Sequence, residues 1–504
     1  MSDEILKQVA EQAAKQAAER ACKQKEQHRR SHLLLLCIII SILGLPWLLL
    51  LAGGIRVRQQ QAQLDIRSDA FFAQIQNYPQ NASAQAFDRL SADLGFSSNA
   101  LYSPQISINA QAAQAYRSIE KSLNRFLDEQ SQLTADPITA LTPDLKDYLN
   151  AHQRKISAVE QHLLAQAAPR WSVDLDQMFD IDYGFPGFTN VLNVQKLLLL
   201  SALNSSQTGQ TAEVWTALEA SWQLNQTLSQ RPDLTSQVLV SVVTEKQAAL
   251  LRHLNNVPPL WRSRLDQQIH SLSIHPSALD GLRFETWLQY KISKKSLATI
   301  LAQPAEALSE ERPKEQPEER TDNHLEKLLA LPTQNFSERL LKSLSAQMSY
   351  WFSPAYYSQL IRIEALQAAQ RAFDQLDRLN VCSTTRIVAE QVMQAESTSW
   401  HQAIAVDPFV TAQRWKLAGD RQLNLELTQK VLQAKQAFQT SRQWPATLPN
   451  LTSQACPNQH WLYERSNNNQ AMSLSLSPSN IVEPSIPLSY RSATELTPTQ
   501  MNPP

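Results

Sequence analysis

The feature that most constrains this chain is a run of twenty residues without a charge, from Leu33 to Ala52. The run contains ten leucines and four isoleucines. A helix of this length rises roughly 30 Å, which matches the hydrocarbon thickness of a bilayer. At about 0.5 kcal/mol for each Leu or Ile, insertion into lipid is favoured by roughly 7 kcal/mol. We therefore predict a transmembrane helix at 32–53 that contacts the lipid bilayer through residues 33–52.

Two other interpretations of this run were weighed. A helix buried in a globular core is rarely apolar on every face, as this one would be. A cleavable signal peptide normally has a short charged leader, whereas residues 1–31 precede this run. Cleavage near Ala52, before Gly53 and Gly54, stays open as the alternative to an uncleaved anchor.

The basic residues around the run indicate its orientation, because cytoplasmic flanks carry an excess of Lys and Arg. Residues 1–31 hold seven basic residues, and only Arg56, Arg58 and Arg67 follow at a comparable distance. The amino terminus is therefore expected in the cytoplasm and the bulk of the chain outside it. Residues 1–31 are rich in Ala, Gln, Lys and Glu, which predicts a cytoplasmic juxtamembrane helix.

The composition outside the membrane segment favours helices and argues against nucleic acid as a partner. Only 9 glycines occur in 504 residues, and hairpins need glycine turns more than helices do. The 46 basic and 47 acidic residues nearly cancel, so no general field attracts nucleic acid. We predict a mainly α fold of antiparallel helical hairpins, arranged as a helical repeat or a bundle.

Proline-rich, charged sequence divides the outer part into regions. Residues 304–323 hold seven acids, three bases and three prolines, which is typical of a linker. A helical extracytoplasmic domain is expected at 54–303 and a second helical region at 324–477. Apolar residues at helical spacing predict the individual helices. In the first domain these are 84–95, 112–126, 142–165 and three helices within 191–254; in the second they are 325–346, 354–379, 384–397 and 423–440.

The end of the chain changes character. Residues 460–465 and 471–477 nearly alternate in polarity around a polar turn at 467–470, which predicts a small β-hairpin. The last residues, 478–504, are rich in Pro, Ser and Thr and are expected to be a disordered tail.

Cys382 and Cys456 are the two cysteines beyond the membrane segment, since Cys22 and Cys37 lie before it and within it. In an oxidising compartment they could form a disulfide. Such a bridge would stabilise the fold by roughly 4 kcal/mol in the chain-entropy model. Two separate reduced thiols remain the alternative.

Candidates for chemistry are few. Asp174, Asp176, Asp180 and Asp182 lie close together and are a weak candidate for a Ca²⁺ site. The twelve-residue calcium loop requires glycine at its sixth position and an acid at its twelfth, but Phe179 and Phe185 stand there. No zinc-protease, nucleophile-elbow, phosphate-loop or dinucleotide motif is present. We therefore predict no metal and no cofactor.

Residues 429–477 carry a resemblance to a known group of proteins. A helix is followed by a Trp-Pro turn with spaced leucines and then by a short hairpin, with the pattern carried by Trp444, Pro445, Leu448, Leu451, Trp461 and Tyr463. This resembles the carboxy-terminal part of uncharacterised bacterial single-pass membrane-anchored helical proteins. It is also faintly similar to the globular heads of type II secretion pseudopilins, but no prepilin cleavage sequence precedes the membrane helix. The resemblance implies location in a bacterial inner membrane and no particular activity.

Three functions are compatible with these features. The first is a protein-binding or scaffolding role in the cell envelope, with a protein partner. The second is an extracytoplasmic hydrolase acting on cell-wall or lipid material, with Asp180, Asp182 or Glu245 as acids in a groove. The third is an accessory role in a secretion system.

Overall fold

The computed structural model describes residues 55–96, 106–136, 138–180, 187–270, 274–302, 354–396, 407–466, 469–477 and 487–493. The predicted helices at 1–31, 32–53 and 325–346 and the linker at 304–323 lie outside these ranges. Within them, no helix is both long enough and apolar enough to cross a membrane. The chain divides into two compact units, and the larger comprises 70–331 and 364–504. In the smaller unit, residues 55–69 and 354–363 are helical.

The prediction of a mainly helical fold is confirmed. The helices are α2 (Ala82–Asp93), α3 (Ala110–Gln132), α4 (Pro143–Ala165), α5 (Leu175–Met178), α6 (Phe188–Gln207), α7 (Thr211–Ser229), α8 (Leu234–His253), α9 (Pro259–His270), α10 (Ile274–Ala302), α13 (Pro354–Arg378), α14 (Arg386–Glu396) and α15 (Pro408–Ser441). The apolar stretch 191–254 forms three of them, α6, α7 and α8, as its pattern predicted.

Side-chain caps fix where several helices begin. Asn81 accepts a hydrogen bond from the backbone of Ala84 at the start of α2, and Asp233 accepts one from Ser236 at the start of α8. Each satisfies a backbone N–H that the helix itself leaves unpaired. Gly95 ends the α2 region with φ +92°, and a Cβ there would collide with the backbone of Ala113. Only glycine fits this close approach of the chain to α3.

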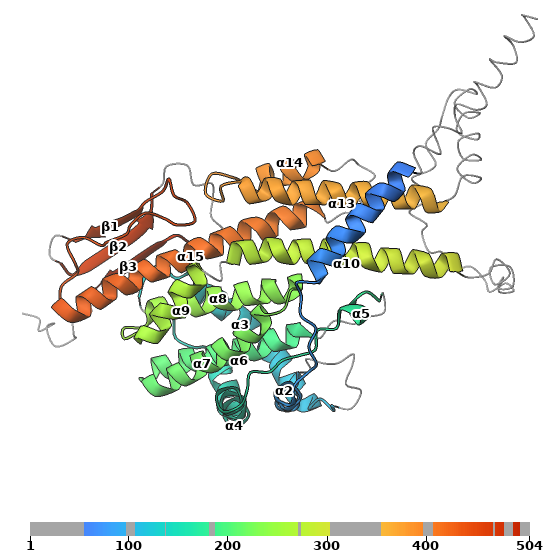
Figure 1. Cartoon of the computed structure of the whole chain (residues 1–504). Coiled ribbons are helices and arrows are strands. Elements are labelled where there is room, and N and C mark those ends of the chain that lie inside the picture. Colours follow the sequence, from blue (N-terminus) through green and yellow to red (C-terminus); the bar gives the residue numbers. More distant parts are fainter. Residues whose placement is uncertain are drawn as a thin grey trace, which may run out of the picture. The chain divides into compact units, whose positions relative to one another are not determined.

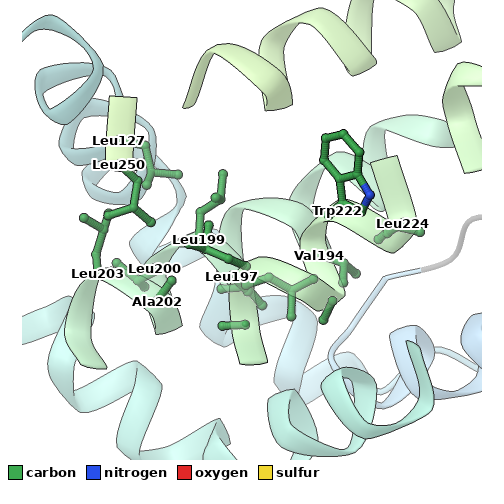
Figure 2. Close-up of a cluster of buried hydrophobic side chains, with 14 of the residues drawn as sticks. Leu127, Val194, Leu197, Leu199, Leu200, Ala202, Leu203, Trp222, Leu224 and Leu250 are labelled. Atoms are coloured by element: carbon green, nitrogen blue, oxygen red, sulfur yellow. The ribbon is translucent and has the colours of Figure 1, made fainter. Parts of the chain in front are cut away.

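The first core cluster is centred on α6. This helix is buried around most of its circumference and packs against α7, α8, α4 and α3. Figure 2 shows Leu197, Leu199 and Leu200 of α6 in one cluster with Trp222 and Leu224 of α7. Burial of a leucine contributes about 1.5–3 kcal/mol, so this run supplies much of the stability of the first region.

Helix α15 joins the two regions on either side of the predicted linker. Its Leu425 and Leu432 belong to the first cluster, while Leu423 and Leu427 belong to a second cluster that includes Leu234 of α8. In Figure 1, α15 runs beside the sheet, and it also packs against α8, α9, α10 and α14.

The sequence prediction began this helix at 423, whereas it begins at Pro408. The first half was missed because its buried face includes Lys416, Asp420 and Gln422, which interrupt the apolar spacing.

The predicted hairpin is part of a larger sheet. Strands β1 (Trp461–Arg465), β2 (Ala471–Leu476) and β3 (Ser489–Ala493) form an antiparallel sheet in the order β1-β2-β3. The prediction that all of 478–504 is disordered is therefore wrong for β3. This strand is fixed by its buried Tyr490 and by a 2.6 Å hydrogen bond from the Arg491 N–H to the Thr134 carbonyl oxygen, neither of which composition could indicate.

Candidate binding groove

A groove of about 740 Å³ lies between α9, α15 and the segment 450–454, which precedes β1. We call it the α9–α15 groove. All of its walls belong to the larger unit. Its lining is mostly polar, and it comprises Pro259, Arg262, Ser263, Leu265, Asp266, His270, Gln429, Lys430, Leu432, Gln433, Gln436, Asn450, Thr452 and Gln454.

Lys430 is the most unusual residue of this lining. Its side chain is only 3% exposed, yet within the described ranges its ammonium forms no hydrogen bond and no ion pair. Burial lowers the pKa of Lys430, while the negative charges of Glu426 and Asp266 act in the opposite direction. The Lys430 Nζ is not one of the fully buried polar atoms of the described residues; it reaches the groove, where water hydrates it. An anion in the groove would replace that water.

The described lining itself carries two cations, Arg262 and Lys430, and one acid, Asp266, while Glu426, which does not line the groove, adds a negative charge near Lys430. Arg262 is half-buried, and its guanidinium forms no hydrogen bond or ion pair with a described residue. Asp266 is the acid among the described lining residues, and its carboxylate accepts a hydrogen bond from the Gln429 amide. His270 donates from Nδ1 to the Asp266 carbonyl oxygen at 2.7 Å, which leaves Nε2 as the ring nitrogen available to a ligand.

Carboxamides form much of the two facing walls. Gln429, Gln433 and Gln436 follow one another at helical spacing on α15, and Asn450 and Gln454 lie on the opposite wall. The Oε1 atoms of Gln429 and Gln433 are buried and do not face the groove, whereas Gln436, Asn450 and Gln454 are exposed. A carboxamide both donates and accepts hydrogen bonds, so these three exposed side chains can pair with peptide groups or hydroxyls.

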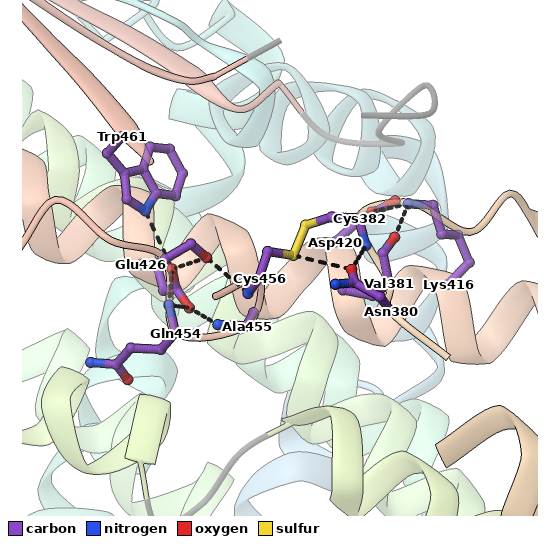
Figure 3. The surroundings of a disulfide bond; sticks show 11 residues. Asn380, Val381, Cys382, Lys416, Asp420, Glu426, Gln454, Ala455, Cys456 and Trp461 are labelled. Carbon is purple, nitrogen blue, oxygen red and sulfur yellow. Dashed lines mark hydrogen bonds and ion pairs between the residues drawn. A yellow bond between two sulfur atoms is a disulfide. The ribbon is translucent and has the colours of Figure 1, made fainter. Parts of the chain in front are cut away.

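The wall at 450–454 is held from behind by a buried carboxylate. Glu426 of α15, which is 1% exposed, accepts hydrogen bonds from Ser453 Oγ at 2.7 Å and from the backbone N–H of Ala455 at 2.6 Å. It also accepts bonds from the Gln454 backbone N–H and from Trp461 Nε1. Figure 3 shows these donors converging on the carboxylate. Bonds to an ionised acceptor are roughly twice as strong as neutral ones, so the turn is fixed firmly to α15.

The same wall is attached covalently to another part of the larger unit. A disulfide joins Cys456 to Cys382, with their Cα atoms 6.2 Å apart, in the usual range for such a bond. Cys382 lies between α13 and α14, where Lys416 donates to the Val381 carbonyl oxygen at 3.0 Å and pairs with Asp420 at 2.9 Å. Both cysteines are buried, and Figure 3 shows the bridge between these two hydrogen-bonded segments.

The aspartates considered from the sequence have other partners. Asp174 caps α5 by accepting from the Gln177 N–H at 3.1 Å, and Asp180 forms an ion pair with Lys295 at 3.0 Å. Asp176 lies within α5, and Asp182 lies outside the described residues. No group of three or more His, Cys, Asp or Glu in the described ranges could hold a metal ion.

Glu245, the other acid proposed for a hydrolase, does not line the α9–α15 groove. Its carboxylate pairs with Arg421 at 2.8 Å and so connects α8 with α15.

A second polar cluster fixes the carboxy-terminal strand. Asp136 accepts from Tyr490 Oη at 2.6 Å and Ser492 Oγ at 2.9 Å, and lies 3.2 Å from Lys435 Nζ and 3.3 Å from His253 Nδ1. Burial alone would raise the pKa of Asp136, but these hydrogen bonds and the Lys435 charge hold it at about 2. Because its partners come from α8, α15 and β3, this cluster joins elements of the larger unit.

No family model matches the chain, and comparisons with curated proteins and with solved structures also find no match. The groove therefore has to be interpreted from its own chemistry.

Sequence analysis missed the groove. The sequence pattern that could have indicated the groove is the helical spacing of Gln429, Gln433 and Gln436 next to Lys430. A search for catalytic motifs does not detect such a pattern.

Proposed function

We propose that this chain is a membrane-anchored protein of the bacterial envelope, and that its helical part lies outside the cytoplasm and binds another protein. Residues 33–52 are the proposed anchor, and the resemblance at 429–477 supports the bacterial setting. The observation that carries the binding role is the α9–α15 groove, whose exposed amides and two cations without a direct partner among the described residues lie between firmly held walls.

The disulfide supports the proposed compartment. Disulfides persist in oxidising compartments and are rare in a reducing cytosol. The Cys382–Cys456 bridge is buried and spans 74 residues of sequence, so it ties distant parts of the fold together rather than capping a surface loop. A fold organised in this way suits a protein that matures outside the cytoplasm.

The lining of the groove favours binding over hydrolysis. General acid–base hydrolysis commonly needs two carboxylates or a His paired with a nucleophile. Among the described lining residues, Asp266 contributes one carboxylate, and His270 has no hydrogen bond to Ser263. The many carboxamides, in contrast, suit recognition of another chain.

Crosslinking in intact cells tests this proposal. A photoreactive residue replaces Gln436, which is exposed at the groove, and in a control strain it replaces Gln153, an exposed glutamine on α4. We expect a discrete adduct with one envelope protein from position 436 and none from position 153. Equal adducts from both positions, or no adduct from 436 in well-expressed protein, would contradict the binding role.

A further inference from the structure

The chemistry of the α9–α15 groove narrows the class of partner. Lys430 is 3% exposed and its ammonium has no hydrogen bond or ion pair with a described residue, and Arg262 lines the same groove without a side-chain partner. Two such cations against the carboxylate of Asp266 favour a ligand that carries negative charge.

The groove has no helix N-terminal cradle for phosphate. Helix N-termini bind phosphate through several free backbone N–H groups. Helix α9 does begin at the groove, but its first turn contains Pro259, directly after Pro258, and neither proline has an N–H. The positive charge therefore comes from Lys and Arg side chains, which bind carboxylates as well as phosphates.

A carbohydrate fits less well than a peptide. Sugar rings present apolar faces that pack well on flat aromatic side chains, and the described lining of the groove contains no Phe, Tyr or Trp. Carboxamides, in contrast, match the alternating N–H and C=O groups of an extended main chain.

The length of the groove wall on α15 also fits an extended chain. Gln429 to Gln436 covers roughly 10 Å of helix, about the length of three residues of extended peptide. Asn450, Thr452 and Gln454 also line the groove, while Ser453 turns back to Glu426. These side chains come from a turn, since Asn450 has φ +55° and the backbone N–H groups of Gln454 and Ala455 both donate to Glu426.

We propose, on the basis of the proposed protein-binding function, that the α9–α15 groove binds an extended acidic peptide segment of a partner protein. Lys430 and Arg262 contact its carboxylates, and Gln436 of α15 together with Asn450 and Gln454 bonds to its main chain.

Peptide binding to the full chain in detergent tests this assignment. The probe is a fluorescent peptide of alternating glutamate and alanine, and the comparison peptide has glutamine in place of each glutamate. We expect the acidic peptide to bind at least about tenfold more tightly, because each lost charge-assisted hydrogen bond costs about one decade or more of affinity. The difference should shrink as salt screens the charges. Equal affinity for the two peptides would overturn the assignment.

Variants locate the binding within the protein. Lys430→Gln and Arg262→Gln should each weaken binding of the acidic peptide about tenfold, and Lys430→Arg should keep most of it because the charge is retained. Lys146→Gln and Arg154→Gln, at exposed positions of α4, are the matched controls and should not change affinity. Affinity unchanged in both groove variants would overturn the assignment even if the acidic peptide binds.

The two proposals can fail separately. If position 436 crosslinks to an envelope protein in cells but the adduct persists unchanged in the Lys430→Gln, Arg262→Gln double variant, the acidic-peptide assignment fails and the binding role stands. If the adduct is absent, the binding role fails as well.

Discussion

At the scale of single residues, two charged groups have opposite effects on stability. Asp136 has four polar partners, whereas the ammonium of Lys430 has no hydrogen bond or ion pair within the described ranges. The first should stabilise the fold, and the second, whose pKa is lowered by burial, should cost a little stability while leaving a cation available to an anion in the groove. The Asp136 cluster could not be predicted from the sequence, because its partners lie far away along the chain.

The Asp136 cluster predicts a specific pH dependence. Its pKa in the fold, about 2, is below the ordinary value of 3.8, so its contribution is present above pH 3.8 and is lost as pH falls towards 2. Asp136→Asn should therefore lower the free energy of unfolding by about 2 kcal/mol at pH 7. Urea unfolding of both proteins at pH 7 and near pH 2 measures this, and a difference that does not shrink in acid would contradict the role given to Asp136.

Lys430→Met should stabilise the protein. The methionine keeps most of the side-chain volume but removes a cation whose burial, which lowers its pKa, is only partly offset by Glu426 and Asp266, so we expect the free energy of unfolding to rise slightly. Thermal unfolding without ligand measures the change, and Lys146→Met on the exposed face of α4 is the control. A loss of stability specific to position 430 would show that its charge already has a stabilising partner.

At the scale of elements, helix α6 was predictable and helix α15 was only half predictable. The leucine run of α6 is apolar enough to identify a buried helix from composition alone. The first half of α15 buries Lys416 and Asp420 as an ion pair, so its apolar spacing is broken although its burial is not. The Trp-Pro turn and the hairpin of β1 and β2 could be predicted, because their polarity pattern lies within neighbouring residues of the sequence. Strand β3 depends on tertiary contacts and was missed.

Truncation in α6 should be costly. Leu200 is completely buried, so Leu200→Ala should lower the free energy of unfolding by about 2–5 kcal/mol through lost burial and the cavity left behind. Leu164→Ala is the matched control, because Leu164 is 41% exposed on α4 and should cost much less. Chemical denaturation compares them, and equal costs would contradict the central place given to α6 in the core.

At the scale of the whole molecule, the disulfide connects compartment, stability and groove. Cys456 follows the groove wall directly, so replacing both Cys382 and Cys456 by serine should lower stability by about 4 kcal/mol and also weaken acidic-peptide binding. The Cys22→Ser, Cys37→Ser variant is the control and should change neither. Chemical unfolding and peptide titration measure the two effects. Unchanged stability and unchanged affinity in the double serine variant would contradict the role given to the disulfide.

The proposed function depends on the chain crossing the lipid once, with its larger unit outside the cytoplasm. In a Cys22→Ser, Cys37→Ser background, single cysteines are placed at Ser309, within 304–323, and at Ser2. Intact cells are treated with a thiol reagent that cannot cross the inner membrane but can reach its outer face. The account predicts labelling at position 309 and none at position 2. Labelling at neither position in intact cells, with both labelled after lysis, would contradict it.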